Sequence, residues 1–450
     1  MFSRRPPLLV VLAALLVLAG LSTLVRFSNV APSTSSLSLG QGSDSTALYC
    51  TGLSGTTGPE VGHYSFLNTT SSTRMLNVEV VSDKNASSLV SIKLGPHHSS
   101  TLVPQSVTSG SSYAAAVQVN GGGVVGEEVT NSHAEAPCVS AGVTNWYASG
   151  FDTTVGSTAE LSIYNPTATP AVFNISTYSP SGFAAPAPFQ GLAVAAHQQT
   201  EINLGSEIVN TSNVATHVRV LRGSIVINGV EQSGPVTSFT QGQSVLSEVT
   251  RFPAVTTVNN AAAQIRVANP SGESVNVVAK VKVVGFSPAP QDLTVSPYAS
   301  GEITITPNSA IPAAGYAIVS VRSSAPVATS LVTGTSAGTA LSSPVTPSNQ
   351  FVVADFAGVG YDAADVTNIL NKTLKVTFTT IPNPGERSDT GSTELAPHST
   401  ESILSVFSGV SSLKGQTLLV TASSRSSLLV TLTLPSTPSG VSVVSPLDGG

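Results

Sequence analysis

The chain has 450 residues and a formal net charge of −6, and only 9% of its residues are charged. This composition excludes the dense basic surface that nucleic-acid binding needs. Because 41% of the residues are hydrophobic, we expect a folded protein with a neutral, hydroxyl-rich surface rather than a disordered chain.

The N-terminus differs from the rest of the chain. Arg4 and Arg5 precede an uncharged apolar run from Leu8 to Val25, whose length fits a membrane-spanning helix or a long signal peptide. Basic residues before the run favour a cytoplasmic N-terminus. Because no convincing cleavage site follows, we predict a single-pass anchor in the cell membrane with the bulk of the chain extracytoplasmic. Secretion is the alternative if the segment is cleaved.

A short turn followed by an alternating strand recurs about every hundred residues, which divides the chain into four copies of one unit. The turns are marked by His97, His197, Tyr298 and His398. Roughly thirty residues before each of these turns, another turn begins with an asparagine after a strand. The four asparagines are assigned as Asn68, Asn165, Asn269 and Asn371. A period of this length indicates a duplicated small domain rather than a solenoid repeat.

Within each copy the apolar residues alternate with polar ones, as Val277, Ala279 and Val281 do. We therefore predict an all-β fold, a tandem array of about four immunoglobulin-like β-sandwich modules after one N-terminal transmembrane helix. The modules are expected to follow one another like beads on a string. Residues 362–369 are the only later segment with mild helical spacing.

The predicted boundaries follow the repeat. They are 1–30 for the membrane anchor or signal, 31–45 for a flexible stalk, 46–136, 143–235, 247–336 and 350–434 for the four modules, and 435–450 for a disordered tail.

Cys50 and Cys138, the two cysteines of the chain, flank the first module. In an oxidising compartment they are expected to pair, and a loop of this size would contribute roughly 4–5 kcal/mol in the chain-entropy model. Two buried free thiols are the alternative.

Three patterns suggest chemistry and each has a plainer interpretation. His97, His197 and His398 resemble metal ligands, but equivalent positions of successive modules should lie far apart, so no metal or other cofactor is predicted. Residues 121–126 satisfy G-x-G-x-x-G, but Asn120-Gly121 favours a hairpin. Trp146, Tyr147 and Phe151 could contact a glycan or a partner, or could fill the start of the second module's core.

The segment Asn145-Trp146-Tyr147 followed by Gly156 and a strand ending in Asn165-Pro166 resembles a repeat in exported actinobacterial proteins of unknown function. The resemblance extends over roughly residues 45–434. It implies no known reaction and carries no catalytic residue.

These observations favour a non-enzymatic, membrane-anchored extracytoplasmic repeat protein with a structural or partner-binding role in the cell envelope. The alternative is a cell-wall glycan-binding or glycan-modifying protein. A third hypothesis is an accessory subunit of a membrane enzyme that is recognised through its anchor. An envelope protein or a cell-wall polysaccharide is the expected partner.

Overall fold

The computed structural model describes residues 46–443, apart from 55–61, 69, 97, 131–134, 257–261, 284–287, 306–315, 335–338, 345–346, 348–349, 355–363, 382–388, 403–416, 425–427 and 433–441. Within these residues the chain is all-β, with many short strands and three single-turn 3-10 helices. The strands fall into four sets, which we call modules 1 to 4.

Modules 1 and 2 are the most completely described. Module 1 comprises β1 (Thr46–Ser54), β2 (Gly62–Asn68), β3 (Arg74–Ser82), β4 (Ser87–Leu94), β5 (Ser99–Leu102), η1 (Pro104–Ser106), β6 (Ser112–Val119), β7 (Val124–Thr130) and β8 (Glu135–Pro137). Module 2 comprises β9 (Asn145–Phe151), β10 (Ser157–Tyr164), β11 (Ala171–Ser179), β12 (Gly182–Ala184), η2 (Ala187–Phe189), β13 (Leu192–Val194), β14 (Gln199–Asn203), η3 (Leu204–Ser206), β15 (Val214–Arg222), β16 (Val226–Ser233) and β17 (Val236–Thr240).

Modules 3 and 4 repeat this order. Module 3 comprises β18 (Ser247–Thr256), β19 (Ala263–Asn269), β20 (Val275–Lys282), β21 (Gln291–Val295), β22 (Ala299–Ile305), β23 (Tyr316–Gly334) and β24 (Thr339–Ser342). Module 4 comprises β25 (Gln350–Ala354), β26 (Ala364–Asn368), β27 (Leu374–Ile381), β28 (Thr390–Leu395), β29 (Thr400–Ser402), β30 (Thr417–Ala422), β31 (Leu428–Leu432) and β32 (Ser442–Val443).

All four modules have the same antiparallel topology. One sheet of module 1 has the order β1-β6-β3-β4 and the other β5-β2-β7-β8, and module 4 repeats this as β25-β30-β27-β28 and β29-β26-β31-β32. In module 2 the fourth strand is split into β12 and β13, which both pair with β11. In module 3 the sixth and seventh strands are continuous in β23, which pairs with β20 in its first half and β19 in its second.

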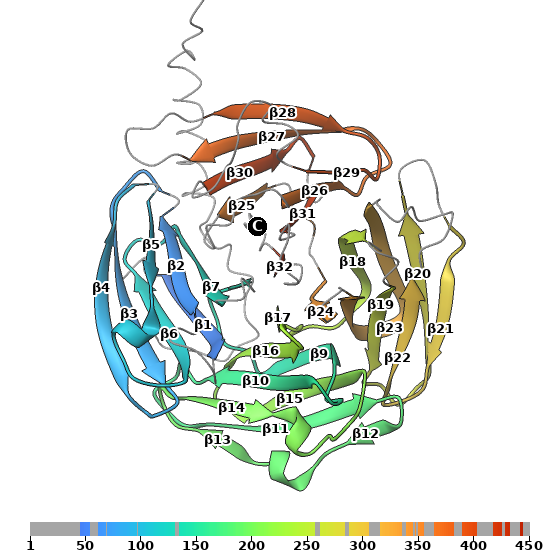
Figure 1. Ribbon diagram of the computed structural model, residues 1–450, viewed down its shortest axis with the longest axis horizontal. Helices are drawn as coiled ribbons and strands as arrows, with labels where there is room; N and C mark the ends of the chain where they lie inside the picture. Colours follow the sequence, from blue (N-terminus) through green and yellow to red (C-terminus); the bar gives the residue numbers. More distant parts are fainter. Residues whose placement is uncertain are drawn as a thin grey trace, which may run out of the picture.

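The modules form a ring rather than an extended string. Figure 1 shows them in chain order around a centre, from module 1 in blue to module 4 in orange and red. Each module lies against the next, and β32 lies against β8, which brings the last module beside the first. The expectation of separated beads was therefore wrong, because successive modules pack against one another.

Each sheet pair encloses its own core, as period-two alternation predicts. In module 1 the core includes Phe66, Val78 and Val117, from strands of both sheets. Module 2 is centred on Trp146, Phe151 and Phe173, and module 3 has a separate valine-rich cluster. In module 4, Leu374, Val376 and Phe378 of β27 are buried in the same alternating pattern. The core of module 2 continues into module 3 through Val332 and Leu341.

One buried asparagine lies at the end of the second strand in modules 1, 3 and 4 and directly after it in module 2. The side-chain amide of Asn165 donates to the carbonyls of Thr169, Val194 and Ala195, and its Oδ1 accepts from Thr167. Asn68, Asn269 and Asn368 make the same set of bonds to three carbonyls and a following backbone N–H. All four side chains are completely buried.

The structure corrects three assignments in module 4. The equivalent asparagine is Asn368, whereas Asn371 is exposed and its Oδ1 lies 2.6 Å from His398 Nε2. The described part of residues 362–369 is a strand, β26, because pairing with β29 and β31 on both sides outweighs a weak helical pattern. The segment 435–450, expected to be a disordered tail, contains β32, which pairs with β31.

Removing the buried amide should destabilise module 4 far more than removing the exposed one. Asn368→Ala leaves three carbonyls without this donor, so we expect a loss of about 3 kcal/mol. Asn371→Ala, three residues later, should cost at most about 0.5 kcal/mol. Urea unfolding of both variants measures the difference, and equal losses would contradict the assignment of Asn368 to the repeat.

Candidate functional site at the module joints

Several buried polar side chains lie where one module meets the next, and we call these places joints. At each joint the first strand of one module lies on the sheet formed by the second and seventh strands of the following module. Thus β1 lies on β10 and β16, β9 on β19 and β23, and β18 on β26 and β31. The same geometry is used three times along the chain.

A glycine bulge brings the first strand close to the next module. The register of β1 shifts at Gly52 (φ +142°), and that of β9 shifts around Gly150 (φ +93°). A Cβ added at Gly52 would lie 2.9 Å from Phe239 of module 2. One added at Gly150 would lie 2.5 Å from Ser330 Oγ of module 3. Glycine therefore satisfies both the backbone conformation and the close approach.

Hydroxyl groups beside these glycines bridge the joints. Thr51 Oγ1 lies 2.8 Å from Ser162 Oγ, and Asn228 Nδ2 donates to the Thr51 carbonyl at 2.7 Å. At the second joint Ser330 Oγ donates to the Ser149 carbonyl at 2.7 Å. The two joints thus repeat one arrangement, in which a hydroxyl residue precedes the bulge glycine.

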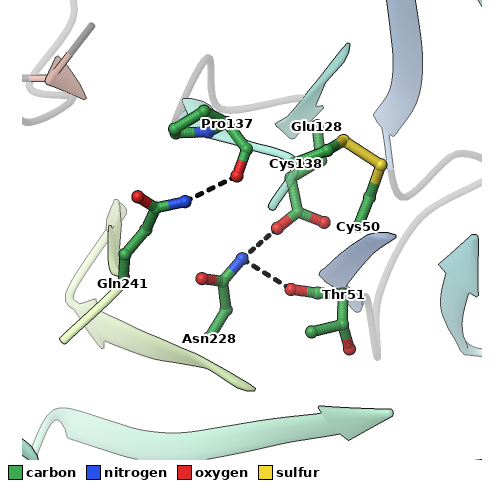
Figure 2. The surroundings of a disulfide bond; sticks show 7 residues. All are labelled: Cys50, Thr51, Glu128, Pro137, Cys138, Asn228 and Gln241. Carbon is green, nitrogen blue, oxygen red and sulfur yellow. Dashed lines mark hydrogen bonds between the residues drawn. A yellow bond between two sulfur atoms is a disulfide. The ribbon is translucent and has the colours of Figure 1, made fainter. Parts of the chain in front are cut away.

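Each of these two joints also holds a buried carboxyl group. Glu128 of β7 is fully buried and accepts a hydrogen bond from Asn228 of module 2 (Figure 2). Burial raises its pKa to about 8, although the bonds from Asn228 and from the Thr51 backbone oppose the shift. Burial also raises the pKa of Tyr64, and the nearby Glu128 carboxyl adds to this rise. A neutral carboxyl is therefore favoured at the first joint around neutral pH.

The second joint uses Glu231 of β16, which accepts from the backbone N–H of Asp152 at 3.2 Å. Burial and the nearby Asp152 raise its pKa to about 8, and Arg266 of module 3 opposes the shift. Arg266 itself lies 3.3 Å from Glu302. The second joint thus places a cation near its buried carboxyl group. At the first joint, no cation is among the contacts described for Glu128.

The apolar part of the joints shows size compensation between equivalent positions. Two strand-paired residues on each side form the contact. At the first joint they are Val81 with Ala114 and Tyr164 with Val226, and at the second they are Tyr178 with Ala215 and Ala268 with Ala328. Within these strand pairs the large ring comes from the following module at the first joint and from the preceding module at the second. In both joints the opposing strand pair carries only smaller side chains.

The residues that mark the repeated turns also lie at the joints, in three different places. His197 Nδ1 lies 3.8 Å from Glu79, the Tyr298 ring packs on Phe183, and His398 lies 3.0 Å from Lys282 Nζ. Each has a positive φ, which is rare for residues other than glycine. His97 lies outside the described residues. No group of three or more metal-ligating side chains occurs within the part of the chain that the structure describes.

The aromatic segment of module 2 faces inward. Trp146 is 2% exposed and its Nε1 donates to the Gln241 carbonyl at 2.5 Å, while Phe151 is completely buried. Tyr147 is half-buried and stacks on His217 with ring centroids 4.1 Å apart. Since neither Trp146 nor Phe151 presents a ring face to solvent, these two fill the core and are not placed to stack on a glycan.

Cys50 and Cys138 form a disulfide, as predicted, and Figure 2 shows that it lies beside the first joint. Cys50 precedes Thr51, and the Pro137 carbonyl next to Cys138 accepts from Gln241 Nε2 at 2.5 Å. The predicted membrane segment from Leu8 to Val25 lies outside the described residues. Among the residues that are described, no helix is long and apolar enough to span a membrane.

Sequence reasoning did not find Glu128, Asn228, Glu231 or the bulge glycines. One signal was available: a hydroxyl residue followed by glycine occurs in the first strand of both module 1 and module 2, at Thr51-Gly52 and Ser149-Gly150. The carboxyl groups gave no such signal, because a charged residue in a strand usually indicates a solvent-facing position.

Gly150→Ala should open the second joint, and Gly156→Ala provides a matched control. Both glycines have φ +93°, but an added Cβ has nothing within 4 Å at Gly156. Both variants should lose about 1 kcal/mol through backbone strain. Gly150→Ala should lose a further 1–3 kcal/mol, roughly, through overpacking. Thermal unfolding measures the stability loss of each variant, and the rate of protease cleavage in the linker 241–246 reports whether the joint has opened. Equal stability losses in the two variants would contradict close packing at the joint.

Glu128 should make stability fall as pH rises. Between its ordinary pKa of 4.5 and its folded pKa of about 8, the folded protein keeps a proton that the unfolded chain has released. Stability is therefore greatest below this window and lowest above it. Glu128→Gln removes the ionisation, so the melting temperature of the variant relative to wild type should rise by on the order of 5 °C from pH 5 to pH 9. A pH-independent difference would argue against a buried ionisable carboxyl.

Comparison with known proteins places this architecture among related sequences. No curated protein matches the chain. A solved structure described as "Crystal structure of tetra-tandem repeat in extending region of large adhesion protein" aligns over 84% of this chain and 92% of that chain, with 12% identity and a TM-score of 0.13. Residues 98–405 match the family described as "Family of unknown function (DUF5719)", which covers parts of all four modules. The chain therefore belongs to this family of unknown function.

Proposed function

We propose that the protein is a non-enzymatic, membrane-anchored extracytoplasmic protein with a structural or partner-binding role in the cell envelope. Its modules are proposed to be immunoglobulin-like β-sandwiches. The observation that carries the proposal is the repeated joint, because the positions that recur through the chain hold modules together. The joints use the buried polar residues Thr51, Glu128, Asn228 and Glu231. Buried polar residues that serve contacts between modules support a role as a scaffold.

Two further observations support the proposed location. The disulfide between Cys50 and Cys138 is a bond that persists in oxidising compartments and is rare in the cytosol. The arrangement of Arg4 and Arg5 before the apolar run from Leu8 to Val25 favours an N-terminus inside and modules outside.

A glycan-binding role is a second candidate, and the structure moves its basis away from Trp146. Phe183 of module 2 is 54% exposed and Tyr298 of module 3 is 48% exposed. Their ring centroids lie 6.2 Å apart across the second joint. Half-exposed aromatic rings at a module boundary are candidates for stacking against a sugar. Loss of binding to purified cell-wall polysaccharide in Phe183→Ala, with unchanged melting temperature, would support this role; wild-type protein that does not bind removes it.

Labelling in the native host tests the proposed location. Val245 is 80% exposed, so Val245→Cys should react with a membrane-impermeant maleimide on intact spheroplasts. Phe2→Cys, before the apolar run, should react only after lysis. The reverse pattern would contradict the proposed orientation. Crosslinking of the labelled protein should then capture an envelope component. A hydrolase or transferase activity that one substitution abolishes would overturn the non-enzymatic role.

A further inference from the structure

The fourth strand of every module lies at the edge of its sheet, at the end away from the module's first strand. These strands are β4, β12 with β13, β21 and β28. β4, β12, β21 and β28 are the terminal strands of their sheets, and β13 pairs with the same strand as β12. In Figure 1 they follow the outer rim of the ring. An edge strand exposes unpaired backbone donors and acceptors, which can pair with another strand unless the edge is blunted.

Three of the four edges are blunted by features that natural edge strands commonly use. In module 2 the edge is broken between β12 and β13 by a segment that contains Pro186 and Pro188. In module 3, β21 has five residues, follows Pro290 and exposes Asp292. In module 4, β28 has six residues and exposes Glu394.

The edge of module 1 is longer than the other three and contains no proline, although it exposes one charged residue. β4 has eight residues, SSLVSIKL, without proline, and its pairing with β3 runs from Arg74–Leu94 to Val81–Ser87 without a register shift. Its only charged residue is Lys93, near its end. Leu89 on its outer face is 73% exposed. No described strand pairs with the other side of β4.

We propose that β4 pairs in antiparallel orientation with β4 of a second copy of this chain, about a two-fold axis at Ser91. This register keeps core-facing residues on one side and outer residues on the other. It places Val90 opposite Ile92, and Leu89 opposite the aliphatic stem of Lys93.

The charge pattern selects this arrangement over a parallel one. An antiparallel pair separates the two Lys93 side chains along the strand, whereas a parallel in-register pair would stack one on the other. The pairing joins two four-stranded sheets into one and extends each module 1 core through half-buried Val90 and Ile92. A self-complementary interface of this kind closes as a dimer rather than a fibre.

Single-cysteine crosslinking of the full-length protein in detergent tests the proposal. Both native cysteines are in the disulfide, so one added cysteine is the only free thiol. Two Ser91→Cys residues would face each other across the axis, with Cα atoms roughly 4.5–5.5 Å apart. Thr294→Cys is the matched control, because Ser91 and Thr294 bond the equivalent Asn77 and Asn276 at 2.9 and 3.0 Å.

We expect Ser91→Cys to give at least about tenfold more disulfide-linked dimer than Thr294→Cys under mild oxidation, and light scattering to show a dimer. Adding Leu89→Lys should abolish the dimer, because the new lysine opposes the partner's Lys93. The variant should still fold, because Glu79 on the neighbouring strand β3 is paired with position 89. Adding Lys93→Glu as well should restore it. Equal crosslinking of both cysteines, a monomer at all concentrations, or capture of a different protein through Ser91→Cys would each overturn the proposal.

Discussion

A single buried asparagine side chain fixes the geometry on which each module depends. At Asn68, Asn165, Asn269 and Asn368, at or directly after the end of the second strand, the amide donates to one carbonyl in the turn that follows this strand. It also donates to two carbonyls at the end of the fourth strand and in the turn after it. Buried carbonyls without a donor are costly, so this one residue ties one sheet to the other in every copy. The turn that it holds presents His197, Tyr298 or His398 to the preceding module, which links the interior of a module to its joint.

The joints show how duplicated modules diverge without losing their geometry. In modules 1 to 3 the first strand lies on the next module's sheet, but the buried polar groups and the large apolar side chains differ between the first two joints. Tyr164 fills the first joint from the following module and Tyr178 fills the second from the preceding one. Because packing constrains total volume more than the identity of either partner, such an exchange preserves the ring. Conservation of an interface therefore need not mean repetition of its residues.

Sequence patterns predicted the parts of the structure that repeat locally. The period of about one hundred residues, the all-β class, the alternation of Val277, Ala279 and Val281, and the pairing of Cys50 with Cys138 follow from spacing and residue type. What lies between modules could not be read in this way. Glu128 looks like a solvated strand residue until module 2 covers it, and Asn371 resembles the repeat asparagine until strand pairing assigns that place to Asn368. The ring itself depends on long-range contacts that no local pattern encodes.

The central claim is that the repeated joints hold four modules together in a ring. Small-angle X-ray scattering of residues 46–450 tests this most directly. A compact chain of this size has a radius of gyration of about 22 Å. The ring predicts a value near that, which rises when Gly150→Ala opens a joint and stays unchanged in Gly156→Ala. A wild-type radius roughly twice as large, that of four modules in an extended row, would contradict the account.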